Sequence, residues 1–234
     1  MWTFLEAVKA WLAQLQFGGL IDTVIVVLAS LLCITFHEIS HGFVAWKLGD
    51  PTAKEAGRLT INPLRHVDLF GLIMMAVFHF GWAKAVPVNV NRLRRPRRDM
   101  ALVALAGPVS NLLMGFVALI LRAVLLYLIL FHWGEAAWSG YVIAFLEYVA
   151  ILSVGLAVFN VIPVPPLDGS KVLFSLLPEE SYRKLLRYER YGMILLMVLL
   201  WTDVLDVPLS MARGWVMDLL SSAAWKPFEW LTGI

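Results

Sequence analysis

An apolar stretch from about residue 21 to residue 46 carries the run His37-Glu38-Ile39-Ser40-His41 in its second half. A stretch this long can cross a membrane as a helix, which needs about 20 residues. Burying two imidazoles and a carboxylate there is costly unless they have a function. At helical spacing His37 and His41 lie one turn apart on one face, so both rings can reach one zinc ion. Glu38 lies about 100° further round the helix, beside the metal but free to act as a general base. The pattern therefore predicts a zinc hydrolase site at membrane depth.

The rest of the chain supports a membrane protein. Hydrophobic residues make up 60% of the 234 residues and charged residues 15%, against roughly 45–50% and 25% in soluble domains. We expect an all-α polytopic membrane protein with about five to six transmembrane helices. Its apolar segments are 21–46, 69–82, 101–131, 141–162, 191–201 and 207–220, and a charged amphipathic helix is expected at 179–190. We expect one domain over 1–234, with a core at 21–175 and C-terminal membrane segments at 176–234.

The region between the first two apolar segments poses a topology problem. Gly, Pro and Asn in 47–68 predict short strands and turns, and 69–82 is short for a crossing. Both 47–66 and the arginine cluster at 92–98 are basic, and the positive-inside rule would put both in the cytoplasm. Either 69–82 is re-entrant or a short tilted helix, or one basic loop breaks the rule; a short helix is favoured. The arginines are typical of a loop beside anionic lipid and not of a nucleic-acid site.

A catalytic zinc usually has three protein ligands and keeps its fourth position for water. Asp168 is the best candidate for the third, because it follows an apolar span and a segment containing Pro163, Pro165 and Pro166. These prolines cannot continue a helix. Within a membrane, the opened backbone is tolerated only inside protein or beside a wet cavity. His66, His79 and His132 are weaker candidates.

Asn111 and Asn160 lie in apolar surroundings, where an amide must find partners. In one interpretation they bind substrate backbone or donate to the oxyanion formed during peptide hydrolysis. In the other they join helices or satisfy carbonyls freed by Pro108 and Pro163. The residues alone favour neither interpretation.

Three motifs in this order, HEISHG, AGPVSN and NVIPVPPLDG, resemble the site-2 protease family of intramembrane zinc metalloproteases. GRLTINPLRHVDLFG and GWAKAVPVN are similar to that family's segments between the metal helix and the next long helix, so the resemblance covers about residues 30–175. It implies His37, His41 and Asp168 as ligands of one Zn²⁺ per chain and Glu38 as the catalytic acid and base. It also implies supporting roles for Asn111 and Asn160. No PDZ-like insertion or CBS-type appendage is evident, so the chain is similar to a minimal form.

The expected function is cleavage of peptide bonds within or near transmembrane segments of other proteins, as in regulated intramembrane proteolysis. The expected partners are a transmembrane protein substrate and the lipid bilayer, without nucleic acid. Small size and the lack of a targeting segment favour a multi-pass protein of a prokaryotic plasma membrane. Residues 57–62 are expected to offer a strand edge to an unwound substrate. The alternative is a transporter that uses the same His/His/Asp site to bind its metal, because broken helices also suit transporters.

Overall fold

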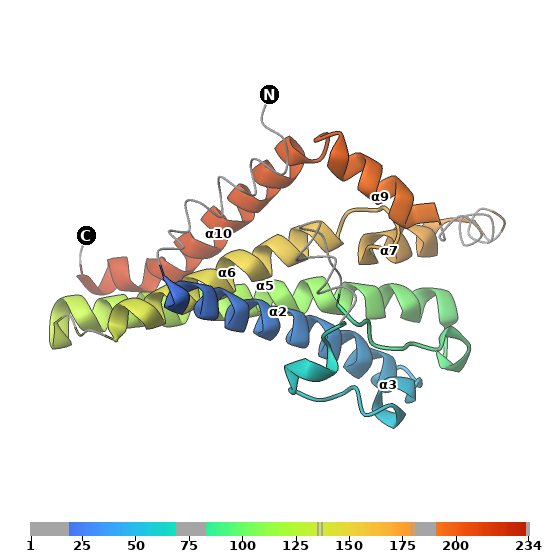
Figure 1. Cartoon of the computed structure of the whole chain (residues 1–234), viewed down its shortest axis with the longest axis horizontal. Helices are drawn as coiled ribbons and strands as arrows, with labels where there is room; N and C mark the ends of the chain where they lie inside the picture. The colour runs from blue at the N-terminus through green and yellow to red at the C-terminus, as the bar shows by residue number, and fades with distance from the viewer. Residues whose placement is uncertain are drawn as a thin grey trace. The chain divides into compact units, whose positions relative to one another are not determined.

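The computed structural model describes residues 19–68, 83–134, 136, 138–178, 180 and 191–232. Every regular element in these ranges is helical (Figure 1). The α-helices are α2 (Leu20–Lys47), α3 (Thr52–Glu55), α5 (Pro96–Leu128), α6 (Ser139–Asn160), α7 (Asp168–Leu176), α9 (Gly192–Trp201) and α10 (Asp206–Thr232). Two short 3-10 helices, η1 (Pro63–Arg65) and η2 (Val90–Arg92), lie between α3 and α5. A π-helical turn, η3 (Ile129–Trp133), extends α5.

The chain divides into two compact units. Among the described residues, unit 1 contains 19–30, 111–159 and 193–232, and unit 2 contains 31–110 and 160–192, apart from their gaps. The predicted metal ligands and Glu38 all belong to unit 2.

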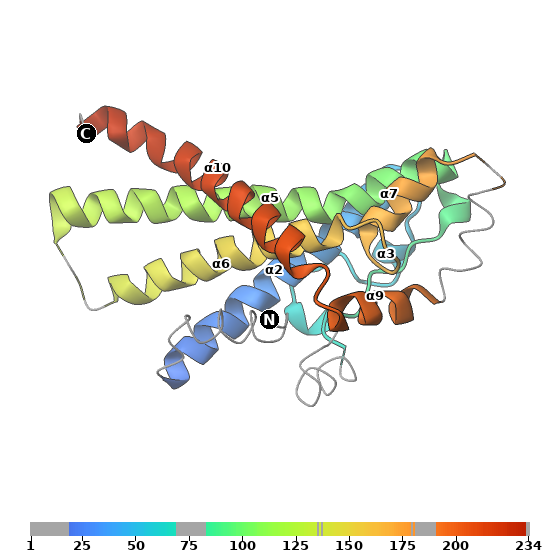
Figure 2. The ribbon, with the colours of Figure 1, turned by 90° about the horizontal axis from the view of Figure 1, so that it is seen from above.

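The three long apolar segments are confirmed as helices. Those able to cross a membrane by length and composition are Ile21–Lys47, Pro96–His132 and Ser139–Asn160. Helices α9 and α10 pass the same test only as a pair bent by 88° (Figure 2), which raises the count to four. The described ranges therefore support three to four spans, and the predicted five to six are not supported. The segments 69–82 and 179–190 lie outside the described residues, except Glu180.

The prediction of strands over 47–68 is wrong. This segment forms α3, η1 and turns, because its polar side chains bond to nearby backbone groups. The Asp50 carboxylate accepts from the Thr52 N–H at 3.0 Å, and the Asn62 amide oxygen accepts from the Leu64 N–H at 3.1 Å. Local bonds of this kind compete with a strand ladder for the same backbone donors.

The two basic segments lie together in unit 2. The Arg94 N–H donates to the Leu48 carbonyl at 3.2 Å, and the Asn89 N–H donates to Asp50 Oδ2 at 2.6 Å. Arg92 pairs with Glu55 at 2.7 Å. The start of α5 therefore lies beside the end of α2, and both basic segments can share one side of a membrane as the positive-inside rule requires.

In unit 1, helices α5 and α6 pack closely. A Cβ at Gly115 would lie 3.3 Å from Val154 Cγ2, so the small residue allows the close approach. Arg122 on α5 pairs with Glu147 on α6, with Nε and Oε2 2.5 Å apart. Since both charges lie in apolar spans, pairing neutralises what would otherwise be costly in lipid.

Candidate zinc centre

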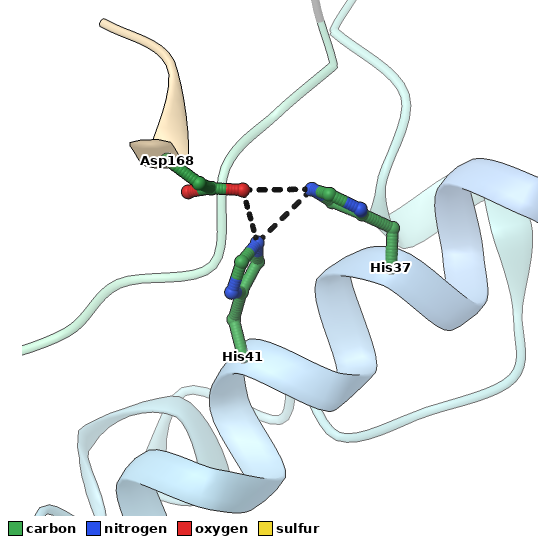
Figure 3. Close-up of side chains that lie close together, drawn as sticks. All are labelled: His37, His41 and Asp168. Atoms are coloured by element: carbon green, nitrogen blue, oxygen red, sulfur yellow. Dashed lines mark hydrogen bonds and ion pairs between the residues drawn. The ribbon is translucent and has the colours of Figure 1, made fainter. Parts of the chain in front are cut away.

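Helix α2 brings the two histidines together as the i, i+4 spacing predicts. His37 Nε2 and His41 Nε2 are 3.0 Å apart, and both side chains are buried (Figure 3). Asp168 faces them from the start of α7, with Oδ2 3.2 Å from His37 Nε2 and 3.1 Å from His41 Nε2. Three potential ligand atoms from residues far apart in the sequence therefore meet at one point.

The proline segment delivers Asp168 to this point. Helix α6 ends at Asn160, no regular element follows until α7 begins at Asp168, and this confirms the predicted helix break at 163–166. Only glycine fits at position 169, where the start of α7 packs against the backbone that follows α6, because a Cβ there would lie 2.0 Å from the Val161 carbonyl oxygen. The Asp-Gly pair thus places a candidate ligand next to a glycine, the residue that lets the backbone pass this close to the Val161 carbonyl.

The donor set fits zinc. The Nδ1 of His41 lies 2.7 Å from the Val103 carbonyl, which can only accept, so Nδ1 carries the proton and the neutral ring has its lone pair on Nε2. That lone pair faces His37 Nε2 and a carboxylate oxygen, a gathering of acceptors that a cation would stabilise. Tetrahedral zinc with bonds of about 2.0–2.1 Å separates its ligand atoms by about 3.3 Å. The observed separations of 3.0 to 3.2 Å come close to this value.

Charge also favours Asp168 as a ligand. Burial alone would raise the pKa of the Asp168 carboxyl, but in the metal-free site hydrogen bonds donated by protonated His37 and His41, together with the charge of the Lys171 ammonium, hold that pKa well below its usual value. Lys171 Nζ lies 3.7 Å from Oδ1, the oxygen that does not face the histidines. The carboxylate is therefore ionised and presents Oδ2 to the metal position.

Helix α5 supplies two features that were not predicted from the sequence. One is the Val103 carbonyl that orients His41, a partner typical of metal-binding histidines. The other is Gly107, where a Cβ would lie 2.5 Å from His37 Cε1 and 2.5 Å from His41 Nε2. A glycine inside a helix costs about 1 kcal/mol relative to alanine, and this cost was the available signal that Gly107 serves packing or function.

Glu38 is buried beside the histidines and accepts a hydrogen bond from the segment that precedes η2. Its Oε2 accepts from the Val86 N–H at 2.8 Å. Val86 belongs to residues 83–89, which precede η2 without forming a regular element. The contact fixes the direction of the carboxylate relative to α2.

The other candidates lie as follows. Asn111 is fully buried on α5, one helical turn beyond Gly107, and Asn160 is the last residue of α6.

His66 is buried with Nε2 2.9 Å from the Thr60 carbonyl, and the His132 ring packs on Tyr127. Neither His66 nor His132 belongs to the metal-ligating group that the described residues contain. His79 lies outside the described residues.

A buried His/His/carboxylate group, whose two histidines and adjacent glutamate lie on a helix apolar enough to cross a membrane, is typical of a metal-dependent hydrolase of the membrane. Comparison with known proteins agrees with this class. The family model described as Peptidase family M50 matches residues 124–202, which include Asp168.

Similar proteins cover most of the chain. The Bacillus subtilis protein named "Putative zinc metalloprotease YwhC" is 39% identical over 204 residues, which are 84% of this chain and 90% of that protein. "Putative zinc metalloprotease Rip2" of Mycolicibacterium smegmatis is 31% identical over 210 residues, covering 84% of this chain and 75% of the relative. No solved structure matches the chain. The chain belongs to peptidase family M50, the site-2 protease family, and is a zinc metallopeptidase.

Proposed function

We propose that the chain is an intramembrane zinc endopeptidase that cleaves within or near the transmembrane segments of other membrane proteins. One observation carries the proposal: three ligand atoms converge beside a buried glutamate on a helix that is apolar enough to span a membrane. The rest of the function follows from what these residues can do chemically.

We assign the metal to His37, His41 and Asp168, whose ligand atoms all lie within 4.8 Å of one another. When bound there, zinc supplies Lewis-acid chemistry, acidifying water and polarising the scissile carbonyl. His41 is kept in the tautomer that leaves Nε2 unprotonated by its bond to Val103. Asp168 contributes the negative charge that balances the metal.

Glu38 acts as the general base and then as the general acid. The Val86 N–H bonds to Oε2, which orients the carboxylate while its second oxygen takes a proton from water and later delivers it to the leaving amine. Because Glu38 follows His37 directly on the helix, it lies next to the metal without ligating it.

Asn111 and Asn160 remain candidates for binding substrate backbone or the oxyanion. The strand edge expected at 57–62 has no counterpart, since these residues form mainly bends and irregular backbone and no strand. We propose that the two units form one catalytic domain over 1–234, with a transmembrane protein as substrate. We place it in the cell membrane as a multi-pass protein, because its helices include three that are long and apolar enough to cross a membrane.

The transporter alternative is not favoured. A transport site needs ligands but has no use for a non-ligating glutamate adjacent to them, and the relatives are named as metalloproteases.

The test is Glu38→Gln in the full-length protein. Cleavage of a membrane substrate should fall at least about 100-fold, because general acid–base catalysis contributes about 10² to 10⁴. Zinc content should stay at one per chain, since residue 38 is not a ligand. Glu55→Gln, an exposed acid on α3 that pairs with Arg92, is the matched control and should cleave normally.

Comparing membrane proteomes of cells with wild-type protein and with Glu38→Gln would reveal substrates as proteins that accumulate uncut. Undiminished cleavage by the purified Glu38→Gln variant would refute the proposed mechanism. A metal flux that survives this change, without any proteolysis by the wild type, would favour the transporter.

A further inference from the structure

Arg97 belongs to the arginine cluster that the sequence associates with lipid, yet its side chain points into the protein. Its Nη2 donates to the Ser175 carbonyl at 3.1 Å and also to the Leu177 carbonyl. These two carbonyls lie at the C-terminal end of α7, the helix that begins with Asp168. We infer that Arg97 is a positioning residue for the zinc centre, which holds the far end of the helix that carries the third ligand.

Helix α7 needs such support. It has nine residues, and isolated helices shorter than about 12 residues are marginal in water. The residue before it, Leu167, provides no side-chain cap. At the other end the last carbonyls lack partners within the helix and carry the negative end of the helix dipole. A guanidinium satisfies both requirements, because it is always charged and offers several donors in a fixed fork.

The direction of Arg97 is set by the start of α5. Pro96 is the first helical residue, where a missing N–H costs nothing. The Asp99 side chain, which is 3% exposed, accepts from the Arg95 N–H at 2.7 Å. This return contact closes the first turn of the helix. Arg97 therefore projects from a capped and rigid turn.

The same helix α5 also holds the histidines. Its Val103 carbonyl bonds to His41 and its Gly107 leaves room for both rings. Helix α5 thus contacts the His37/His41 pair directly and Asp168 through Arg97 and α7. If the Arg97 contact is lost, α7 is free to shift and Asp168 no longer has a fixed distance from the histidines.

The inference rests on the proposed role of Asp168 as a zinc ligand, and it is tested by zinc release from the full-length protein. Arg97→Met retains the apolar stem and removes the donors, Arg97→Lys retains a charge without the fork, and Arg98→Met is the matched control. Arg98 is adjacent and exposed. Zinc transfer to excess EDTA is followed at low temperature, with the unfolding temperature of each variant measured in parallel.

Zinc release should be about 10-fold faster in Arg97→Met, at the lower end of the 10–100-fold effects of residues that support metal ligands. Arg97→Lys should fall between this variant and the wild type, and Arg98→Met should stay within about twofold. Added zinc should restore turnover of Arg97→Met with an unchanged KM, which a general folding defect would not allow.

Wild-type zinc release from a folded Arg97→Met would overturn the inference, as would a lowered unfolding temperature without faster release. If Arg97→Met does not fold, the Arg97→Lys variant is used instead, and wild-type zinc release from a folded Arg97→Lys would overturn the inference. A wild-type protein without zinc would instead refute the proposed function, so the two failures are distinguishable.

Discussion

Gly107→Ala would place a methyl group where the two imidazoles now lie. The new Cβ would be 2.5 Å from His37 Cε1, 2.5 Å from His41 Nε2 and 2.6 Å from His41 Cε1. Ordinary contacts between such atoms are about 3.5–4.0 Å, so the rings must retreat by about 1 Å. His41 cannot retreat without lengthening its 2.7 Å bond to Val103, and the ligand separations of 3.0 to 3.2 Å would change with it.

Two opposing effects on stability can be separated. Alanine in a helix interior should stabilise α5 by about 1 kcal/mol relative to glycine, whereas overpacking costs about 1–3 kcal/mol. The net effect on unfolding is therefore small, about 0–2 kcal/mol. Zinc affinity should fall much more, by about 10–100-fold or further, because both ligands are displaced.

Zinc competition with a chelator, together with thermal unfolding, tests this reasoning. The matched control is Gly155→Ala in α6, where a Cβ would meet no atom within 4 Å, so zinc affinity should be unchanged and stability equal or higher. A Gly107→Ala protein with wild-type zinc affinity would show that the histidine geometry does not depend on this space.

Two further predictions concern charges outside the zinc centre. Arg122→Leu or Glu147→Leu alone leaves an unpaired charge in an apolar span and should cost about 2–3 kcal/mol in thermal unfolding; the double variant should regain most of this loss, and additive losses would contradict the pairing. Burial raises the pKa of Asp50, but bonds from Thr52 and Asn89 and the Arg92 charge outweigh it, so the pKa in the folded protein lies below the usual value. The resulting stabilisation is present above pH of about 4 and is lost as the pH falls through the folded pKa. Asp50→Asn should lower the unfolding temperature at pH 7, and the unfolding temperature of this variant should fall less steeply below pH of about 4 than that of the wild type. A variant with the same dependence of unfolding temperature on pH as the wild type would refute the stabilising role of the Asp50 carboxylate.

The candidate site shows how far local spacing carries a prediction. The contact between His37 and His41 follows from helical periodicity alone, because residues four apart lie on one face whatever surrounds the helix. The break before Asp168 also follows from local chemistry, since three prolines cannot continue α6. The choice of Asp168 as third ligand required an argument about membrane cost and a family resemblance, and the structure brings its carboxylate to the histidines.

Where local patterns misled, the side chains had competing partners. Glycine, proline and asparagine in 47–68 indicated strands, but Asp50 and Asn62 bond to nearby backbone groups and produce turns and short helices. The arginines at 92–98 formed one class in the sequence, yet Arg92 pairs with Glu55 and Arg97 caps α7. The sequence shows which charged side chains are present, but it does not show which groups they pair with in the folded protein.

The sequence by itself determined the long helices, the i, i+4 histidine pair with its glutamate, and the place where the chain must leave the helix. These depend on backbone geometry within a few residues. Only the tertiary structure decided that Asp168 meets the histidines, that Val103 orients His41, that Gly107 makes room for both rings and that Arg97 holds α7. Each of these joins residues far apart in the sequence, and such contacts arise from helix packing that no local periodicity specifies.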